Sequence, residues 1–263
     1  MRNIRLTICY DGSDFHGWQR QPDFPSVQEA LEMAVEQITG HRPDITASGR
    51  TDAGVHALGQ VVHFFCPSRL APEVLVRAIN AKLPRSIRVL DAEDVPQAFH
   101  ATLDARSKRY RYVIDNAPIP DPFRRRYSWH VGSRLDEAAM HRAAQALRGR
   151  HDFRSFETEW PNRTSSVRTI LDIAVSRDGP VVTIEVEADG FLYNMVRSIT
   201  GTLVLIGAGR RPESFAAEAL AAQSRAAAGP TAPPQGLFLL LVRYGRTPAT
   251  PLDEEGPPRP HLP

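Results

Sequence analysis

Gly49-Arg50-Thr51-Asp52-Ala53-Gly54-Val55-His56 is a polar segment without hydrophobic periodicity, and it lies between two stretches of β-forming residues. Its glycines and small side chains leave the backbone accessible, a setting in which a side chain can meet a ligand closely. One interpretation of Asp52 is a turn residue held in a salt bridge. The other is a nucleophile or base that an arginine keeps ionised, because a guanidinium at short range lowers a carboxyl pKa by about 1–3 units.

The sequence on either side of this segment alternates between strand and helix patterns. Ser26 and Glu29 form a capping box at the start of the first predicted helix, and Gly40 supplies its C-terminal stop. The predicted strands are residues 4–10, 45–47, 60–66, 87–90, 110–115, 170–176, 181–187 and 237–244. The predicted helices are residues 27–38, 72–83, 135–147, 191–205 and 215–223.

This order of elements predicts an α+β protein made of two related α/β halves, with a mixed and mostly antiparallel sheet. Residues 1–104 form the half that carries the Asp52 loop, and residues 105–246 form the second half. Residues 247–263 are rich in proline and are predicted to be a flexible tail.

The composition narrows the class of protein. A chain of 263 residues with 42% hydrophobic residues buries a substantial core. It has neither a signal-peptide pattern nor an apolar run long enough to span a bilayer, so we expect a cytoplasmic protein. The net charge of +2 does not indicate nucleic-acid binding, but the basic clusters at 106–111 and 124–126 can bind a polyanion locally.

The sequence lacks the residues that several other kinds of reaction require. No second carboxylate is paired with Asp52 by spacing, which disfavours a hydrolase acting on a glycosidic bond, because that reaction divides its roles between two carboxyl groups. His56, His63 and Cys66 lack a further metal ligand at motif spacing. The sequence contains no phosphate-cradling loop and no dinucleotide fingerprint, so we expect chemistry that needs no metal and no cofactor.

Two further segments carry candidate site residues. In residues 109–112, strand alternation places Tyr110 and Tyr112 on one face and two arginines on the other. This pattern is typical either of a platform for an unstacked base with phosphate contacts or of an ordinary edge strand. Arg197 lies off the apolar face of its predicted helix, either as a surface arginine or as the partner of a buried acid.

A series of short motifs runs along the chain: Tyr10-Asp11-Gly12, Gly17-Trp18-Gln19-Arg20-Gln21, Ser26-Val27-Gln28, the segment 49–56, Gly59-Gln60-Val61-Val62-His63-Phe64, Arg109-Tyr110-Arg111-Tyr112, His151-Asp152-Phe153 and Met195-Val196-Arg197. In these residues and in their order the chain resembles the tRNA pseudouridine synthase A family. The resemblance extends from the first strand to about Tyr244 and leaves out only the tail.

The resemblance implies the pseudouridine synthase fold with a central RNA-binding cleft. It also implies isomerisation of uridine to pseudouridine at positions 38, 39 and 40 of the tRNA anticodon stem-loop, after base flipping. Asp52 matches the catalytic aspartate, which acts at C1′, at the base or by elimination toward a glycal, and Arg197 matches the basic residue that pairs with it. Tyr110 matches the tyrosine that stacks on the target uracil, and the resemblance also makes its hydroxyl a candidate proton acceptor. Arg50 matches the arginine that enters the RNA helix where the nucleotide leaves.

The resemblance further implies a homodimer that binds the tRNA anticodon arm, with no membrane and no small-molecule cofactor. Thr102 stands where an arginine contacting the RNA backbone is expected. The competing hypothesis is a non-catalytic module for tRNA binding or folding, which would tolerate the loss of Asp52. The expected RNA contacts are Arg69, Arg106, Arg109, Arg111, Arg124, Arg125 and Arg126.

Overall fold

The computed structural model describes residues 1–158 and 165–245, so the predicted tail 247–263 lies outside the described residues. The strands are β1 (Arg2–Tyr10), β2 (Thr46–Ala47), β3 (His56–Cys66), β4 (Ile87–Val95), β5 (Ser107–Asp115), β6 (Trp129–His130), β7 (Gly149–Asp152), β8 (Val167–Asp178), β9 (Val181–Ala188) and β10 (Leu237–Arg243). The helices are α1 (Val27–Thr39), α2 (Pro72–Asn80), α3 (Glu137–Gln145), α4 (Met195–Gly207) and α5 (Phe215–Ala222), with 3-10 turns at Arg154–Phe156, Arg225–Ala227 and Pro234–Gly236. In the described ranges, no helix has the length and apolar character needed to cross a membrane.

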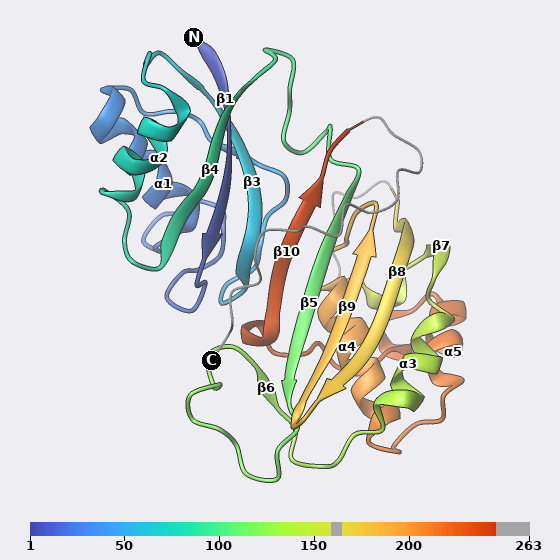
Figure 1. Cartoon of the computed structure of the whole chain (residues 1–263). Coiled ribbons are helices and arrows are strands. Elements are labelled where there is room, and N and C mark those ends of the chain that lie inside the picture. Colours follow the sequence, from blue (N-terminus) through green and yellow to red (C-terminus); the bar gives the residue numbers. More distant parts are fainter. Residues whose placement is uncertain (159–164, 246–263) are drawn as a thin grey trace.

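The strands form one mixed and mostly antiparallel sheet, which confirms the predicted fold class. Their order is β4-β1-β3-β10-β5-β9-β8-β7, with β2 beside β3 and β6 beside β5 (Figure 1). The pairs β3–β10 and β5–β6 are parallel. Helices α1 and α2 lie at the β4 end of the sheet, whereas α3, α4 and α5 gather at the β7 end (Figure 1).

Helix α1 begins and ends where the sequence predicts. The Ser26 hydroxyl accepts the backbone N–H of Glu29 at 3.3 Å. Gly40 adopts the left-handed conformation with φ 69° and donates its N–H to the carbonyl of Glu36. A residue without Cβ adopts this conformation without steric cost, so the helix stops here.

Helix α4 begins four residues later than predicted, at Met195 instead of Phe191. Asn194 has φ 62°, a left-handed conformation that cannot continue a right-handed helix. Residues 191–194 therefore form a turn, and their side chains line the site described below. Strands β6 and β7 were not predicted because two and four residues are too few for an alternating pattern to be recognised.

The buried core follows the alternation of the strands. In β1, Ile4, Leu6 and Ile8 are fully buried while the residues between them are partly exposed. They join one continuous buried cluster that also takes in apolar residues of α1, β5 and α4. The side chains buried at every second position of the strands thus pack against those buried at every third or fourth position of the helices, in one shared core.

The two halves of the sheet meet where β3 lies beside β10. The parallel ladder between them is short, with Phe238 opposite His56 and Leu239 opposite Ala57. Just beyond it, a Cβ atom on Gly59 would lie 2.5 Å from the carbonyl oxygen of Leu240. Glycine at this position therefore permits the close approach of the two strands.

We expect Gly59→Ala to lower the free energy of unfolding by about 1–3 kcal/mol, because backbone atoms of β10 must move to admit the methyl group. Urea denaturation measures this change. Gly132→Ala is the control, since its Cβ would come no closer than 3.4 Å to a neighbouring atom, on the His130 ring. Equal stability of the two variants would contradict this account of the junction.

Candidate active site

The Asp52 loop lies against the loop that follows β1, and glycines allow the contact. A Cβ on Gly12 would lie 2.0 Å from the carbonyl oxygen of Val55, and one on Gly17 would lie 2.7 Å from that of Thr51. The Thr51 carbonyl accepts the backbone N–H of Trp18 at 3.0 Å. Two motifs that are distant in sequence, residues 10–12 and 17–21, thus form the support of segment 49–56.

Asp52 opens a tight turn that presents its side chain to the cleft. Its carbonyl accepts the N–H of Val55 at 3.1 Å, and Gly54 has φ 76° within the turn. On the other side of Asp52, the Thr51 hydroxyl lies 2.8 Å from the hydroxyl of buried Tyr10. The backbone on both sides of Asp52 is therefore fixed.

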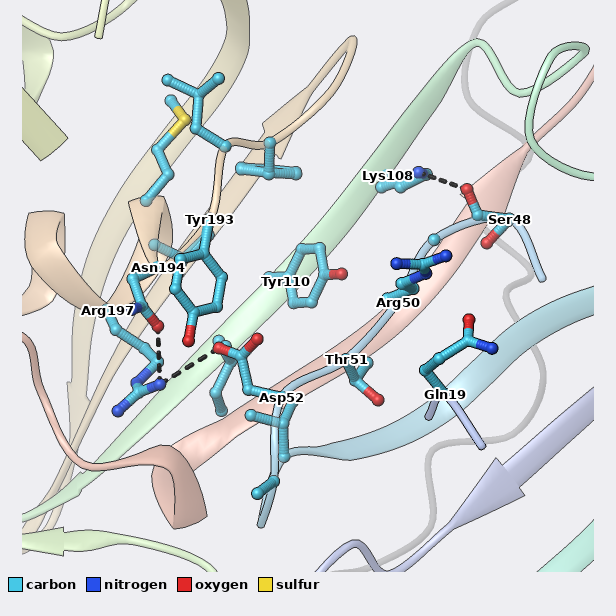
Figure 2. A pocket seen from close by; sticks show the side chains of 18 of the residues that line it. Gln19, Ser48, Arg50, Thr51, Asp52, Lys108, Tyr110, Tyr193, Asn194 and Arg197 are labelled. Carbon is cyan, nitrogen blue, oxygen red and sulfur yellow. Dashed lines mark hydrogen bonds and ion pairs between the residues drawn. The ribbon is translucent and has the colours of Figure 1, made fainter. Parts of the chain in front are cut away.

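Arg197 reaches Asp52 from the first turn of α4. Its Nη1 donates to Oδ2 of Asp52 at 3.1 Å and to Oδ1 of Asn194 at 2.7 Å (Figure 2). Its Nε donates to the Ala232 carbonyl at 2.7 Å. The guanidinium is thus oriented by three acceptors, and the second carboxylate oxygen of Asp52 has no hydrogen-bond partner in residues 1–158 and 165–245.

The charge state of Asp52 is set by two opposing effects. Burial raises the pKa of this carboxyl above its usual value, and the charge and hydrogen bond of Arg197 lower it. Burial is the larger effect, so the pKa is raised overall. The sequence predicted the opposite direction because it indicated the arginine but gave no information on how deeply the loop is buried.

Tyr110 forms the wall beside Asp52. Its ring meets Phe191 edge-on, with centroids 5.0 Å apart and an interplanar angle of 81°. Burial, together with the charges of Tyr10 and Asp52, raises the pKa of its hydroxyl well above the usual range, so this phenol is neutral at physiological pH. The side chain offers an apolar ring and a neutral hydroxyl to whatever enters the cleft.

These groups line a cleft of about 750 Å³, a volume suited to a small organic ligand or one nucleotide. The structure brings together the four residues that the sequence singled out as catalytic or substrate-binding: Arg50, Asp52, Tyr110 and Arg197 all line it. Arg50 is exposed at the cleft.

Other side chains of the cleft were not singled out from the sequence. Asn194 escaped notice because it was predicted to lie within a helix. Lys108 was obscured by the arginines around it, although it stands two residues before Tyr110 on the same strand. Phe24 is half-exposed at the cleft, with its ring 4.4 Å from that of His16, and its proline-rich surroundings show no periodicity.

The seven arginines predicted as further RNA contacts do not line the cleft. Arg109 and Arg111 point to the opposite face of β5, where Glu187 and Glu185 neutralise them at 2.8 and 2.6 Å. The other five lie on loops: Arg69 after β3, Arg106 before β5, and Arg124, Arg125 and Arg126 between β5 and β6. Contact of any of the seven with RNA stays a prediction.

Thr102 and His56 have structural contacts near the cleft. The Thr102 hydroxyl donates to the carbonyl of Ala47 at 2.7 Å. Nδ1 of His56 accepts the backbone N–H of Gly12 at 3.1 Å, so Nε2 carries the proton and donates to the carbonyls of Arg126 and Gln235. Burial lowers the pKa of His56, which keeps the ring neutral.

In the described ranges, no group of three or more His, Cys, Asp or Glu residues is arranged to hold a metal ion.

Comparison with known proteins identifies the family to which this chain is similar. A family model described as tRNA pseudouridine synthase matches residues 7–104 and 143–245. The chain is 47% identical over 244 residues to tRNA pseudouridine synthase A of Moorella thermoacetica, covering 92% of this chain and 99% of that protein. It is 44% identical over 261 residues to the protein of the same name from Myxococcus xanthus, covering 97% and 98%.

The Thermoanaerobacter sp. (strain X514) protein of that name is 42% identical over 244 residues, which cover 93% of this chain and all of that one. Among solved structures, the crystal structure of the archaeal box H/ACA sRNP Nop10-Cbf5 complex aligns with 76% of this chain and 42% of that chain, at 14% identity and a TM-score of 0.31. That structural similarity is too weak to inform the site. The family model and the relatives agree, and the chain belongs to the tRNA pseudouridine synthase family.

Proposed function

We propose that this protein isomerises uridine to pseudouridine at positions 38, 39 and 40 of the tRNA anticodon stem-loop. The proposal rests on one observation. The residues that line the cleft include a single carboxylate, Asp52, which is ion-paired to Arg197 and adjacent to Tyr110. The names of the relatives supply tRNA as the substrate class. The three positions follow from the motif resemblance.

The chemistry of this isomerisation fits a site with a single carboxylate. The N1–C1′ bond breaks and a C5–C1′ bond forms, C5 loses its proton, and N1 gains one. The proton lost from C5 is balanced by the proton gained at N1 and no redox change occurs, so the composition of the nucleotide is unchanged and the reaction consumes no co-substrate. Hydrolysis of a glycosidic bond instead divides its work between two carboxyl groups.

The positions of these residues in the cleft support the roles that the resemblance implies. The free oxygen of Asp52 faces the reacting nucleotide, whether it acts at C1′, at the base or by elimination. Tyr110 supplies an apolar surface for a flipped uracil, since an extruded base is held by stacking on aromatic rings. Arg50, exposed at the cleft, replaces the flipped nucleotide in the RNA helix. The homodimer and the cytoplasmic location implied by the resemblance stay predictions.

Asp52→Asn should abolish pseudouridine formation, with a loss of about 10³-fold or more, because the amide cannot act as nucleophile or base. Affinity for tRNA should remain, since the change removes a negative charge from an RNA-binding cleft. Pseudouridine mapping and filter binding on an unmodified transcript measure the two properties. Asp91→Asn, an exposed position on β4, is the control. Near-normal turnover by Asp52→Asn would contradict the catalytic role of Asp52, whereas tRNA binding by the unsubstituted protein without any pseudouridine formation would favour the non-catalytic tRNA-binding module.

Tyr110→Phe keeps the ring and removes only the hydroxyl. We expect binding to survive and the turnover rate to fall by about 10²–10⁴-fold, the range for loss of a group that transfers a proton. Tyr110→Ala, which also removes the stacking surface, should weaken binding as well. Because the phenol is neutral, its hydroxyl can accept a proton only if it passes its own proton on at the same time. Full activity of Tyr110→Phe would show that it does not act in this way.

Arg197→Gln should move the acidic limb of the pH–activity profile to higher pH. Burial raises the pKa of Asp52 and Arg197 lowers it, so removing the guanidinium raises it further. The reactive carboxylate then forms only at higher pH, and activity lost near neutrality should partly return as the pH increases. Arg177→Gln, whose guanidinium pairs with Glu137, is the control. A uniform loss of activity with an unmoved limb would contradict this role.

A further inference from the structure

The cleft carries more positive charge than its one carboxylate can neutralise. Its lining includes the cations Arg50, Lys108 and Arg197, and Asp52 is its one acid. Asp52 pairs with Arg197. The other two cations have no carboxylate within ion-pair distance in the described parts of the chain.

Lys108 is the less obvious of these two cations, because it is largely buried. It stands two residues before Tyr110 in β5, and residues two apart on a strand face the same side. Both side chains therefore face the cleft, while Arg109 between them faces away and pairs with Glu187. Figure 2 shows Asp52, Tyr110 and Lys108 in succession along the cleft.

Backbone and side-chain contacts hold the ammonium of Lys108 in a defined position. Its Nζ donates to the Ser48 carbonyl at 2.6 Å (Figure 2). Buried Gln60 fixes that segment, accepting the Ser48 hydroxyl at 2.6 Å and donating to the Gly49 carbonyl at 2.8 Å. A Cβ on Gly49 would lie 2.8 Å from Nζ, so glycine at this position leaves room for the ammonium.

This environment leaves the ammonium incompletely satisfied. It has three N–H donors and the described residues supply one acceptor, the Ser48 carbonyl. Burial, assisted by the like charge of Arg168, lowers its pKa to about 8. A buried cation without an acidic partner is costly, and an anionic ligand with free oxygens would remove that cost.

We propose that Lys108 binds a backbone phosphate next to the nucleotide that stacks on Tyr110. With the reacting sugar at Asp52 and the base on Tyr110, this phosphate lies at the far end of the cleft. The Ser48 carbonyl holds the ammonium in place, and its two remaining donors take phosphate oxygens. This inference rests on the proposed function, because it requires RNA as the ligand.

The test compares tRNA binding by Lys108→Met, Lys108→Arg and Lys82→Met, all in the inactive Asp52→Asn background. Lys108→Met should raise the Kd about tenfold or more, the loss expected for a charged hydrogen bond. It should also make the slope of log K against log salt concentration shallower by about 0.7–0.9, because one phosphate contact is lost. Lys108→Arg should restore both. Lys82 is exposed after α2, so Lys82→Met removes the same charge outside the cleft and should change neither.

A second measurement uses the titration of the lysine itself. As the pH rises through about 8, Lys108 loses its charge, so the affinity of the Asp52→Asn protein for tRNA should fall. The Asp52→Asn protein that also carries Lys108→Arg should bind equally well across the range. Identical pH responses, or an unchanged salt slope in Lys108→Met, would overturn the proposal. Because binding is measured in an inactive background, failure here is distinguishable from failure of the proposed catalysis, which the activity of the unsubstituted protein tests.

Discussion

The site depends on the ion pair between Asp52 and Arg197, whose partners are 145 residues apart in the sequence. One comes from a loop between β2 and β3, the other from the start of α4 in the second half of the chain. Such a pair is a poor source of stability, because removing two charges from water costs about as much as their attraction returns. Its presence at the junction of the halves therefore points to function. The packing of the halves sets the distance between the two groups, and the ionisation of the carboxylate depends on that distance together with its burial.

Strand β5 shows how one element serves both the site and the sheet. Its alternation sends Lys108 and Tyr110 to the cleft and Arg109 and Arg111 to the other face. There Arg109 pairs with Glu185 and Glu187 of the adjacent strand β9 and with Asp172 of β8, the strand beyond it. These partly buried pairs hold the register of the strand, and a shift of one residue would exchange the two faces. The position of the aromatic ring in the cleft is thus tied to charges on the opposite surface.

Local chemistry made much of this structure predictable. The Ser26 cap and the Gly40 stop depend on residues close in sequence, and each is found where its pattern indicates. For Asp52, Tyr110 and Arg197, the residue patterns alone left a structural and a functional role open, and the resemblance of the ordered motifs to a known family indicated the functional one. What could not be predicted depends on distant contacts. The two-residue ladder between β10 and β3 leaves no pattern in either strand. The left-handed turn at Asn194 delays the start of α4, and the Asn194 side chain there contacts Thr158 and Arg197.

The raised pKa of Asp52 has a chemical consequence once RNA is considered. A carboxylate of higher pKa is a better nucleophile and base, provided that it stays ionised at the working pH. An entering polyanion brings further negative charge and excludes water, and both effects would raise the pKa further and protonate the group. Arg197 opposes this directly at 3.1 Å. Arg50 and Lys108 line the same cleft, and as cations they would oppose it at longer range. In the proposed function, the uncompensated positive charge of the cleft would thus both favour RNA binding and help to keep Asp52 ionised while the substrate is present.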